Sequence, residues 1–171
     1  MIIEDGILKD YSGDPIHVVI PDGVVRIGGI MTDEDQRSGK YRKEEFIFYK
    51  PFPQRSPVEV LEIPPSVKVV GDKAFEHCPN LRTVVFSEGL EHIGLSAFMG
   101  DKEITELRFP ASLKTIGIWA FHCCSSLKDV YFKGKVTFKG QIIDGINTFK
   151  NDSEYPFGGL QNIKFHFENC D

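Results

Sequence analysis

Apolar and polar positions along the chain repeat with a period of 23 residues. Phe75, Phe98 and Phe121 each follow an Ala, and each lies four residues after a Gly. Three further apolar columns keep the same step: Leu61, Val84, Leu107 and Val130; Ile63, Phe86, Phe109 and Phe132; and Leu81, Ile104 and Leu127. Such a period is typical of repeat proteins, in which each unit buries its apolar face against its neighbours.

Each unit contains three apolar pieces separated by polar positions. Around Val84 and Phe86 the apolar residues alternate with others, which predicts a short strand with one buried face. The piece from Leu90 to Gly94 predicts a second short strand that ends at a sharp corner, because Gly tolerates a positive φ or a close backbone approach. The piece that begins with Ala97 and Phe98 is too short for a stable helix, so we expect a single helical turn.

Degenerate turns flank the regular repeats on both sides. Residues 16–28 match 59–71 at an offset of 43, which is one period plus a 20-residue insertion within 29–51. Upstream, the segments 4–8 and 11–14 predict a hairpin that covers the first turn. We therefore expect one domain, 1–171, with an N-terminal cap and degenerate first turn at 1–57 and regular repeats at 58–132.

The last part of the chain, 133–171, is expected to form a degenerate C-terminal turn with a loop at 141–157. Val136 and Gly140 keep the columns of Leu113 and Gly117. The last strand is predicted from Leu160, Ile163 and Phe165, which are aligned with Leu127, Val130 and Phe132. Six stacked turns result.

These residues resemble the leucine-rich repeats of the BspA type, with their recurring Leu-x-x-Ile-x-Ile-Pro, Ile-Gly and Ala-Phe-x-x-Cys signatures. The resemblance is best over 58–132, and the Asn column of the better known leucine-rich repeats is missing. We therefore predict a mainly β repeat solenoid of leucine-rich-repeat type. It has about six right-handed turns, a parallel sheet on one face, and second short strands and single helical turns on the other.

Composition and charge support a strand-rich protein and disfavour two classes of partner. Ile, Phe and Val, at 17, 14 and 13 residues, outnumber Leu and Ala, at 9 and 4, which favours strands over helices. The formal net charge of −5 disfavours nonspecific binding to nucleic acid or to an anionic membrane. The opening residues lack the pattern of a secretory signal, so the expected location is cytoplasmic, or secreted or surface-bound if the chain is a fragment.

The outward positions of the predicted parallel sheet form the first candidate binding surface. The inward columns are uniform from turn to turn, whereas the outward positions vary, as expected of a recognition surface on a constant scaffold; any solvated sheet face also varies. The residues predicted to contact a partner on this face are Glu62, Thr83, Val85, Glu106, Arg108, Asp129, Tyr131 and Lys164. Lys164 is expected in the row of Arg108 and Tyr131.

A second candidate surface, the corner patch, consists of Leu95, Ile118 and Trp119, which follow the Ile-Gly step in two successive turns. The repeat does not require apolar residues there, and Trp is enriched at interface hot spots. Self-association or partner docking is one interpretation. Coverage of the patch by the 141–157 loop is the other.

The cysteines and histidines predict neither a disulfide nor a metal site. Cys78 and Cys124 occupy one column two turns apart, which places their Cα atoms near 10 Å, beyond the limit of about 7 Å for a disulfide. We expect free core thiols there, and a more solvated corner at Asp101, which takes their place in the turn between. His77 and His122, each beside a cysteine, are too far apart to share a metal. No cofactor is predicted.

No catalytic motif emerges from the sequence, so we expect a non-enzymatic protein. Glu106 and Asp129 are neighbours in one outward row, but Arg108 lies close enough to neutralise them. The predicted function is a non-catalytic protein–protein interaction scaffold with an unidentified protein partner. The resemblance also implies an alternative, an adhesive or glycan-binding module derived from a secreted parent, because similar repeats occur in bacterial and protist surface proteins implicated in adhesion.

Overall fold

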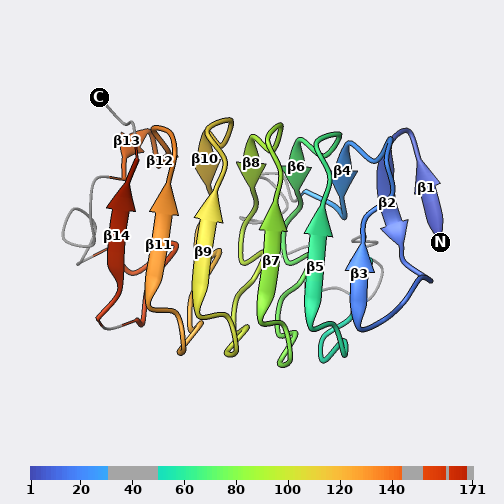
Figure 1. Ribbon diagram of the computed structural model, residues 1–171, viewed down its shortest axis with the longest axis horizontal. Coiled ribbons are helices and arrows are strands. Elements are labelled where there is room, and N and C mark those ends of the chain that lie inside the picture. The colour runs from blue at the N-terminus through green and yellow to red at the C-terminus, as the bar shows by residue number, and fades with distance from the viewer. Residues whose placement is uncertain (31–49, 144–151, 161, 169–171) are drawn as a thin grey trace, which may run out of the picture.

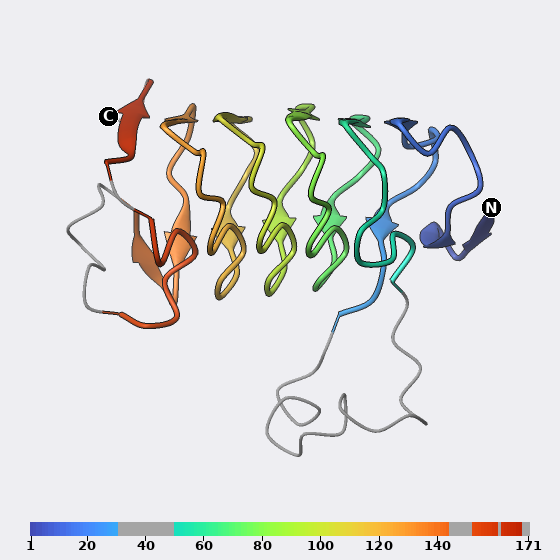
Figure 2. The same ribbon diagram turned by 90° about the horizontal axis from the view of Figure 1, so that it is seen from below.

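The computed structural model describes residues 1–30, 50–143, 152–160 and 162–168, which form fourteen strands and no helix. The turns of the chain lie side by side in a row, seen from the front in Figure 1 and from below in Figure 2. No helix able to span a membrane is found in these ranges. Most of the predicted insertion, 31–49, lies outside the described residues.

One face of the stack carries six strands of three or four residues each, which are in front in Figure 1. These are β3 (His17–Val19), β5 (Val60–Ile63), β7 (Thr83–Phe86), β9 (Glu106–Phe109), β11 (Asp129–Phe132) and β14 (Lys164–Phe167). In both β5–β7 and β9–β11, paired residues lie 23 positions apart, as in Val60 with Thr83. β3 pairs with β5 at the predicted offset of 43, as in His17 with Val60. The 23-residue stacking and the degenerate first turn are therefore confirmed.

The predicted single parallel sheet is interrupted in its middle. The six strands form two three-stranded parallel sheets, β3-β5-β7 and β9-β11-β14, without a ladder between β7 and β9. The repeat columns determine which residues become neighbours, but a ladder also requires the two strands to keep hydrogen-bonding distance. On β7 the inward side chains of Val84 and Phe86 are only half-buried, whereas Leu107 and Phe109 on β9 are buried.

The opposite face is an eight-stranded sheet, behind the first in Figure 1, in which most strands are only two residues long. In sheet order it consists of β1 (Ile2–Glu4), β2 (Ile7–Asp10), β4 (Arg26–Ile27), β6 (Val69–Val70), β8 (His92–Ile93), β10 (Thr115–Ile116), β12 (Thr137–Phe138) and β13 (Gln141–Ile142). The inner pairs are parallel, and β1–β2 forms an antiparallel hairpin against β4. A hairpin therefore covers the first turn as predicted, but its strands are Ile2–Glu4 and Ile7–Asp10 rather than the predicted segments 4–8 and 11–14.

A second hairpin, β12–β13, closes the other end of this sheet and corrects the prediction for Gly140. Lys139 and Gly140 form its turn with positive φ values of 49° and 77°, as a two-residue hairpin of this kind requires. Gly140 therefore does not occupy the column of Gly117. The chain departs from the repeat because Val136 and Phe138, both buried, are one residue closer together than Leu113 and Ile116.

The last strand has a different register from the one predicted. Phe165 pairs with Val130 and Phe167 with Phe132, whereas the expected neighbours were Ile163 and Phe165. A shift of two residues leaves every side chain on the same side of the sheet, so alternation alone cannot exclude it. The Phe167 ring stacks on Phe132 at 5.3 Å between centroids.

A column of stacked aromatic rings runs through the core. Phe75, Phe98 and Phe121 stack with centroids 5.3 and 5.2 Å apart and planes within 8° of parallel. Phe52 extends the column at one end, at 4.5 Å from Phe75, and Phe157 extends it at the other, at 5.4 Å from Phe121. The predicted spine, which includes Phe52 in the column of Phe75, is confirmed, and Phe157 extends it by one ring beyond the prediction.

The predicted single helical turns are hydrogen-bonded turns instead. In the turn that begins at Ser96, Met99 N–H donates to the Ser96 carbonyl. Residues with positive φ, such as Lys73 and His77 in one turn and Trp119 and Cys123 in another, prevent helical backbone from continuing. The preceding glycines allow close approach, because a Cβ on Gly117 would lie 2.6 Å from the carbonyl carbon of Gly94.

Candidate functional site

The outer surface of β3, β5, β7, β9, β11 and β14, here called the sheet face, contains all eight residues predicted to bind a partner. They are Glu62 on β5, Thr83 and Val85 on β7, Glu106 and Arg108 on β9, Asp129 and Tyr131 on β11, and Lys164 on β14. Seven of them occupy the expected positions. Lys164 pairs with Asp129 rather than with Tyr131, because of the two-residue shift of β14, and His166 takes the position beside Tyr131.

On the C-terminal half of the sheet face, three side chains stack across three strands. The guanidinium carbon of Arg108 lies 3.9 Å from the centroid of the Tyr131 ring. The His166 ring stacks on Tyr131 with centroids 4.3 Å apart and planes 10° from parallel. Tyr131 is therefore flanked by a cation and an imidazole, which orders an otherwise exposed aromatic side chain.

The two carboxylates that are neighbours on this half each have a different basic partner. Arg108 Nε donates to Glu106 Oε1 at 2.6 Å, and His166 Nε2 lies 2.8 Å from Asp129 Oδ1. Both pairs are exposed or half-buried on an open surface. The arrangement therefore forms a network of charged and aromatic groups rather than an isolated carboxylate pair of the kind used in acid–base catalysis.

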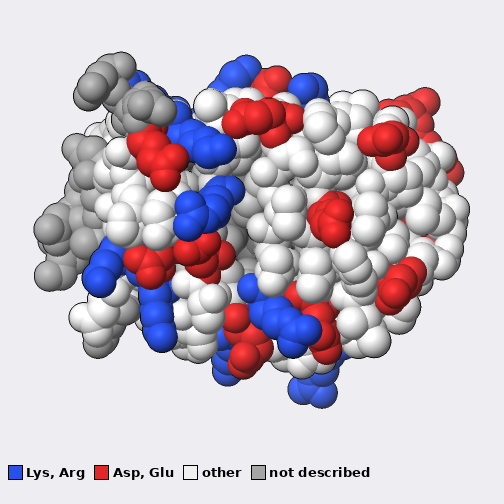
Figure 3. Space-filling view, viewed as in Figure 1, with Lys and Arg blue, Asp and Glu red and all other residues white. Residues whose placement is uncertain are grey.

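The N-terminal half of the sheet face has a more apolar character. Val19 and Val85 are 50% and 47% exposed. Among the described residues, the ion pair of His17 Nε2 with Glu62 Oε1, at 2.6 Å, joins β3 and β5. Figure 3 shows this difference, with Lys and Arg gathered toward the left and isolated acidic groups on an otherwise uncharged surface toward the right.

A groove of about 730 Å³ separates the two halves at the interruption between β7 and β9. Val84 and Phe86 line its inner part, and Arg82, Glu88, Glu106, Arg108 and Lys133 are among the charged residues around it. The repeat columns did not indicate this groove. Val84 and Phe86 belong to the same residue types as their column neighbours, so no local signal distinguishes an open position from a closed one.

The corner patch is partly covered by the segment 152–159, part of which belongs to the predicted 141–157 loop. The indole N–H of Trp119 donates to the Ser153 carbonyl at 2.6 Å, and the backbone N–H of Trp119 donates to the Glu154 carbonyl at 3.2 Å. Trp119 remains 37% exposed, and Leu95 and Ile118 are half-buried. These contacts favour coverage by the chain itself over self-association at Trp119.

The cysteine column is buried and contains a carboxyl group between two thiols. Cys78 and Cys124 are free and inaccessible, as predicted, whereas Cys123 is exposed. Burial raises the pKa of Cys78 to about 12 and also raises the pKa of Cys124, so both thiols are protonated and poor nucleophiles. Cys170 lies outside the described residues.

Asp101 is inaccessible, which corrects the prediction of a more solvated corner. Its Oδ1 accepts a hydrogen bond from the Cys78 backbone N–H at 2.7 Å. This bond gives a polar partner to a backbone amide inside the core, which explains why a carboxyl group is accommodated at that position. No group of three potential metal ligands occurs among the residues that the structure describes.

The sequence matches the BspA type leucine rich repeat region, in six copies, over residues 45–170. No curated protein matches it at a significant level.

Among solved structures, the fold is similar to that of a leucine rich cell surface protein from Faecalibacterium prausnitzii, with a TM-score of 0.62 and 23% identity. The similarity covers 93% of this chain and 35% of that one, so this chain spans about a third of its relative. A leucine rich repeat protein from T. pallidum has a TM-score of 0.50 and 21% identity, over 95% of this chain and 77% of that one. At these identities the likeness concerns the fold.

Proposed function

Since the chain belongs to the BspA-type leucine-rich repeat family, we propose that it is a non-catalytic binding protein whose sheet face contacts a protein partner. The observation that carries the proposal is the contrast between the inward and the outward side chains of the strands that form the sheet face. Their inward side chains form a regular core, whereas their outward side chains combine exposed apolar groups with an ordered network of charges. This combination suits a protein interface, where apolar and aromatic contacts provide affinity and charges provide specificity.

Two features of the sheet face support a protein as the partner. Val19 and Val85 are about half-exposed, which offers apolar area for burial. The stack of Arg108, Tyr131 and His166 offers an aromatic ring and a cation whose positions are already ordered before binding. Side chains held in this way lose less entropy when a partner binds.

The alternative of a glycan-binding adhesive module has weaker support. Glycan recognition commonly uses an open aromatic face as a platform, but Arg108 and His166 cover the two faces of Tyr131. The Faecalibacterium relative is a cell surface protein. If this chain is part of an adhesin, the contacts described here favour a protein ligand over a sugar.

Replacing Arg108 and Tyr131 together by Ala should weaken the capture of a protein partner at least tenfold. Both side chains lie on the surface, so the free energy of unfolding should change by about 1 kcal/mol or less. The measurement is affinity capture from a lysate of the native host, quantified by mass spectrometry, with circular dichroism as the test of folding.

The matched control replaces Lys68 and Lys114, two exposed lysines on the side of the eight-stranded sheet, by Ala. This variant should capture the same partner as the unchanged protein. Capture that survives in the Arg108 and Tyr131 variant but fails in the control variant would place the binding surface on the opposite side. A Trp119→Ala variant tests the corner patch in the same way and should retain capture.

A further inference from the structure

The groove between β7 and β9 exposes backbone groups that a continuous sheet would use. In parallel strands, alternate residues direct N–H and C=O toward the same neighbour. Thr83 N–H donates to the Glu59 carbonyl on the β5 side, so the backbone groups of Val84 and Phe86 are directed toward β9. Asp129 N–H donates to the Thr105 carbonyl on the β11 side, so those of Glu106 and Arg108 are directed toward β7. With no ladder between β7 and β9, these groups border the groove.

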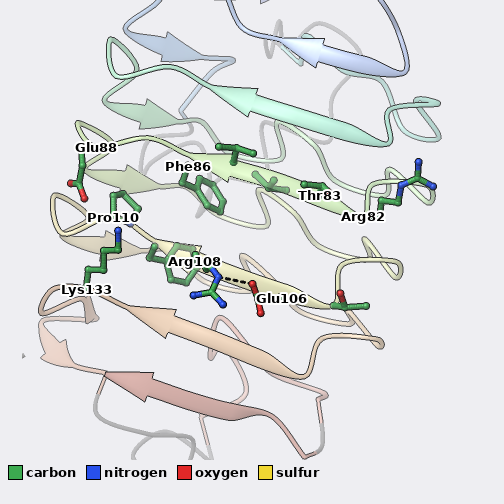
Figure 4. Close-up of a pocket in the computed structure, with 12 residues that line it drawn as sticks. Arg82, Thr83, Phe86, Glu88, Glu106, Arg108, Pro110 and Lys133 are labelled. Carbon is green, nitrogen blue, oxygen red and sulfur yellow. Dashed lines mark hydrogen bonds and ion pairs between the residues drawn. The ribbon is translucent and has the colours of Figure 1, made fainter. Parts of the chain in front are cut away.

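The floor of the groove is apolar and partly open. Val84 and Phe86 line it and are half-buried, whereas Leu107 and Phe109, which occupy the same columns in the next turn, are buried. Phe86 is held by edge contact with Phe98 at 5.9 Å and by Phe109 at 5.4 Å. Figure 4 shows Phe86 between the two strands. A rigid aromatic group is therefore accessible at the bottom of the groove.

Among the described residues, most charges around the groove are paired with other groups, and one cation is not. Glu88 accepts from the backbone N–H groups of Ala111 and Ser112 at 3.1 and 3.2 Å. Glu106 is bound by Arg108, and Arg82 is paired with Glu59 at 2.5 Å. Lys133 has no hydrogen-bond or ion-pair partner within the described ranges. Figure 4 places it beside Pro110, at the end of the strands opposite Arg82.

We propose that this groove binds an extended peptide segment of a partner protein, with an apolar side chain on Phe86 and a carboxylate side chain at Lys133. An extended peptide fits because it can lie along the outer opening of the groove, where its own backbone N–H and C=O groups can reach those of one bordering strand. The lining runs from Arg82 to Glu88 and from Thr105 to Pro110, a length of roughly 15–20 Å at the rise of a strand. The proposal rests on the proposed function and specifies its partner.

The first test is selection from a random dodecapeptide phage library on the immobilised full chain. Selected peptides should share an apolar residue with an Asp or Glu a few positions away. A synthetic peptide of the selected sequence should bind Lys133→Glu at least tenfold more weakly than it binds the unchanged protein. Lys102→Glu is the matched control, because Lys102 is also an exposed lysine but lies outside the strands of the sheet face and does not line the groove. Its affinity for the peptide should stay within twofold.

The second test is amide hydrogen exchange followed by NMR. In the free protein the amides of Val84, Phe86, Glu106 and Arg108 should exchange faster than those of Leu61 and Val130, and the selected peptide should slow those on the strand that it contacts. Slow exchange at these four amides in the free protein would show a continuous sheet and overturn the proposal. Selection of no peptide, or equal binding to Lys133→Glu and the unchanged protein, would also overturn it. Loss of capture by the Arg108 and Tyr131 variant, with no peptide selected, would leave the sheet face as the binding surface and remove only the groove.

Discussion

Replacing Phe98 by Ala should lower the free energy of unfolding by about 3–5 kcal/mol. The Phe98 ring is fully buried and stacks between Phe75 and Phe121, at 5.3 and 5.2 Å. It also meets the edge of Phe86 at 5.9 Å. Because each turn packs only against its neighbours, the cavity would disrupt both interfaces of the central turn. Urea denaturation, followed by circular dichroism, measures the effect.

The matched control for this change is Phe167→Ala. The Phe167 ring also stacks on another Phe, but it lies on the last strand and is 40% exposed. Its loss should cost about 1 kcal/mol or less, because water already reaches much of the ring. A cost below about 1 kcal/mol for Phe98→Ala itself would be incompatible with the stacking described here.

Replacing Asp101 by Asn should stabilise the protein increasingly as the pH rises. Burial is the largest influence on this carboxyl group and raises its pKa from 3.8 to about 9. Between these two values, the folded protein keeps a proton that the unfolded chain has lost. Stability contributed by the protonated group is therefore present in full below about pH 4 and is lost progressively as the pH rises toward 9.

Asn has the shape of the protonated acid and can accept the same hydrogen bond from Cys78 N–H, but it does not titrate. The free energy of unfolding of Asp101→Asn, relative to the unchanged protein, should grow by on the order of 2–4 kcal/mol between about pH 5 and pH 8. Parallel urea titrations at several pH values measure this difference. A difference that does not change with pH would mean that Asp101 is ionised in the folded protein.

The repeat architecture could be predicted from the sequence because a fixed period leaves little freedom. Once Phe75, Phe98 and Phe121 stack, every other column must follow at the same step, and the pairings of β5 with β7 and β9 with β11 do so. The offset of 43 in the first turn was equally accessible, because thirteen consecutive positions repeat the column pattern across the insertion. The outward position of the sheet-face residues follows from the same alternation.

Three features could not be predicted because they depend on packing rather than on pattern. The last strand alternates Ile163, Phe165 and Phe167, so two registers place apolar groups inside, and the choice depends on the stacking of rings. Asp101 has a polar side chain in an apolar column, and its burial depends on a hydrogen bond to the preceding turn. The groove depends on the spacing of β7 and β9, which is not encoded by any single residue.

The claim that the sheet face is the binding surface is tested most directly by site-specific photo-crosslinking. A benzophenone amino acid is placed at position 85, on the sheet face, or at position 114, an exposed position next to β10 on the other side. Irradiation in the native host should yield a crosslinked partner from position 85 and none from position 114. A partner crosslinked from position 114 alone would contradict the claim.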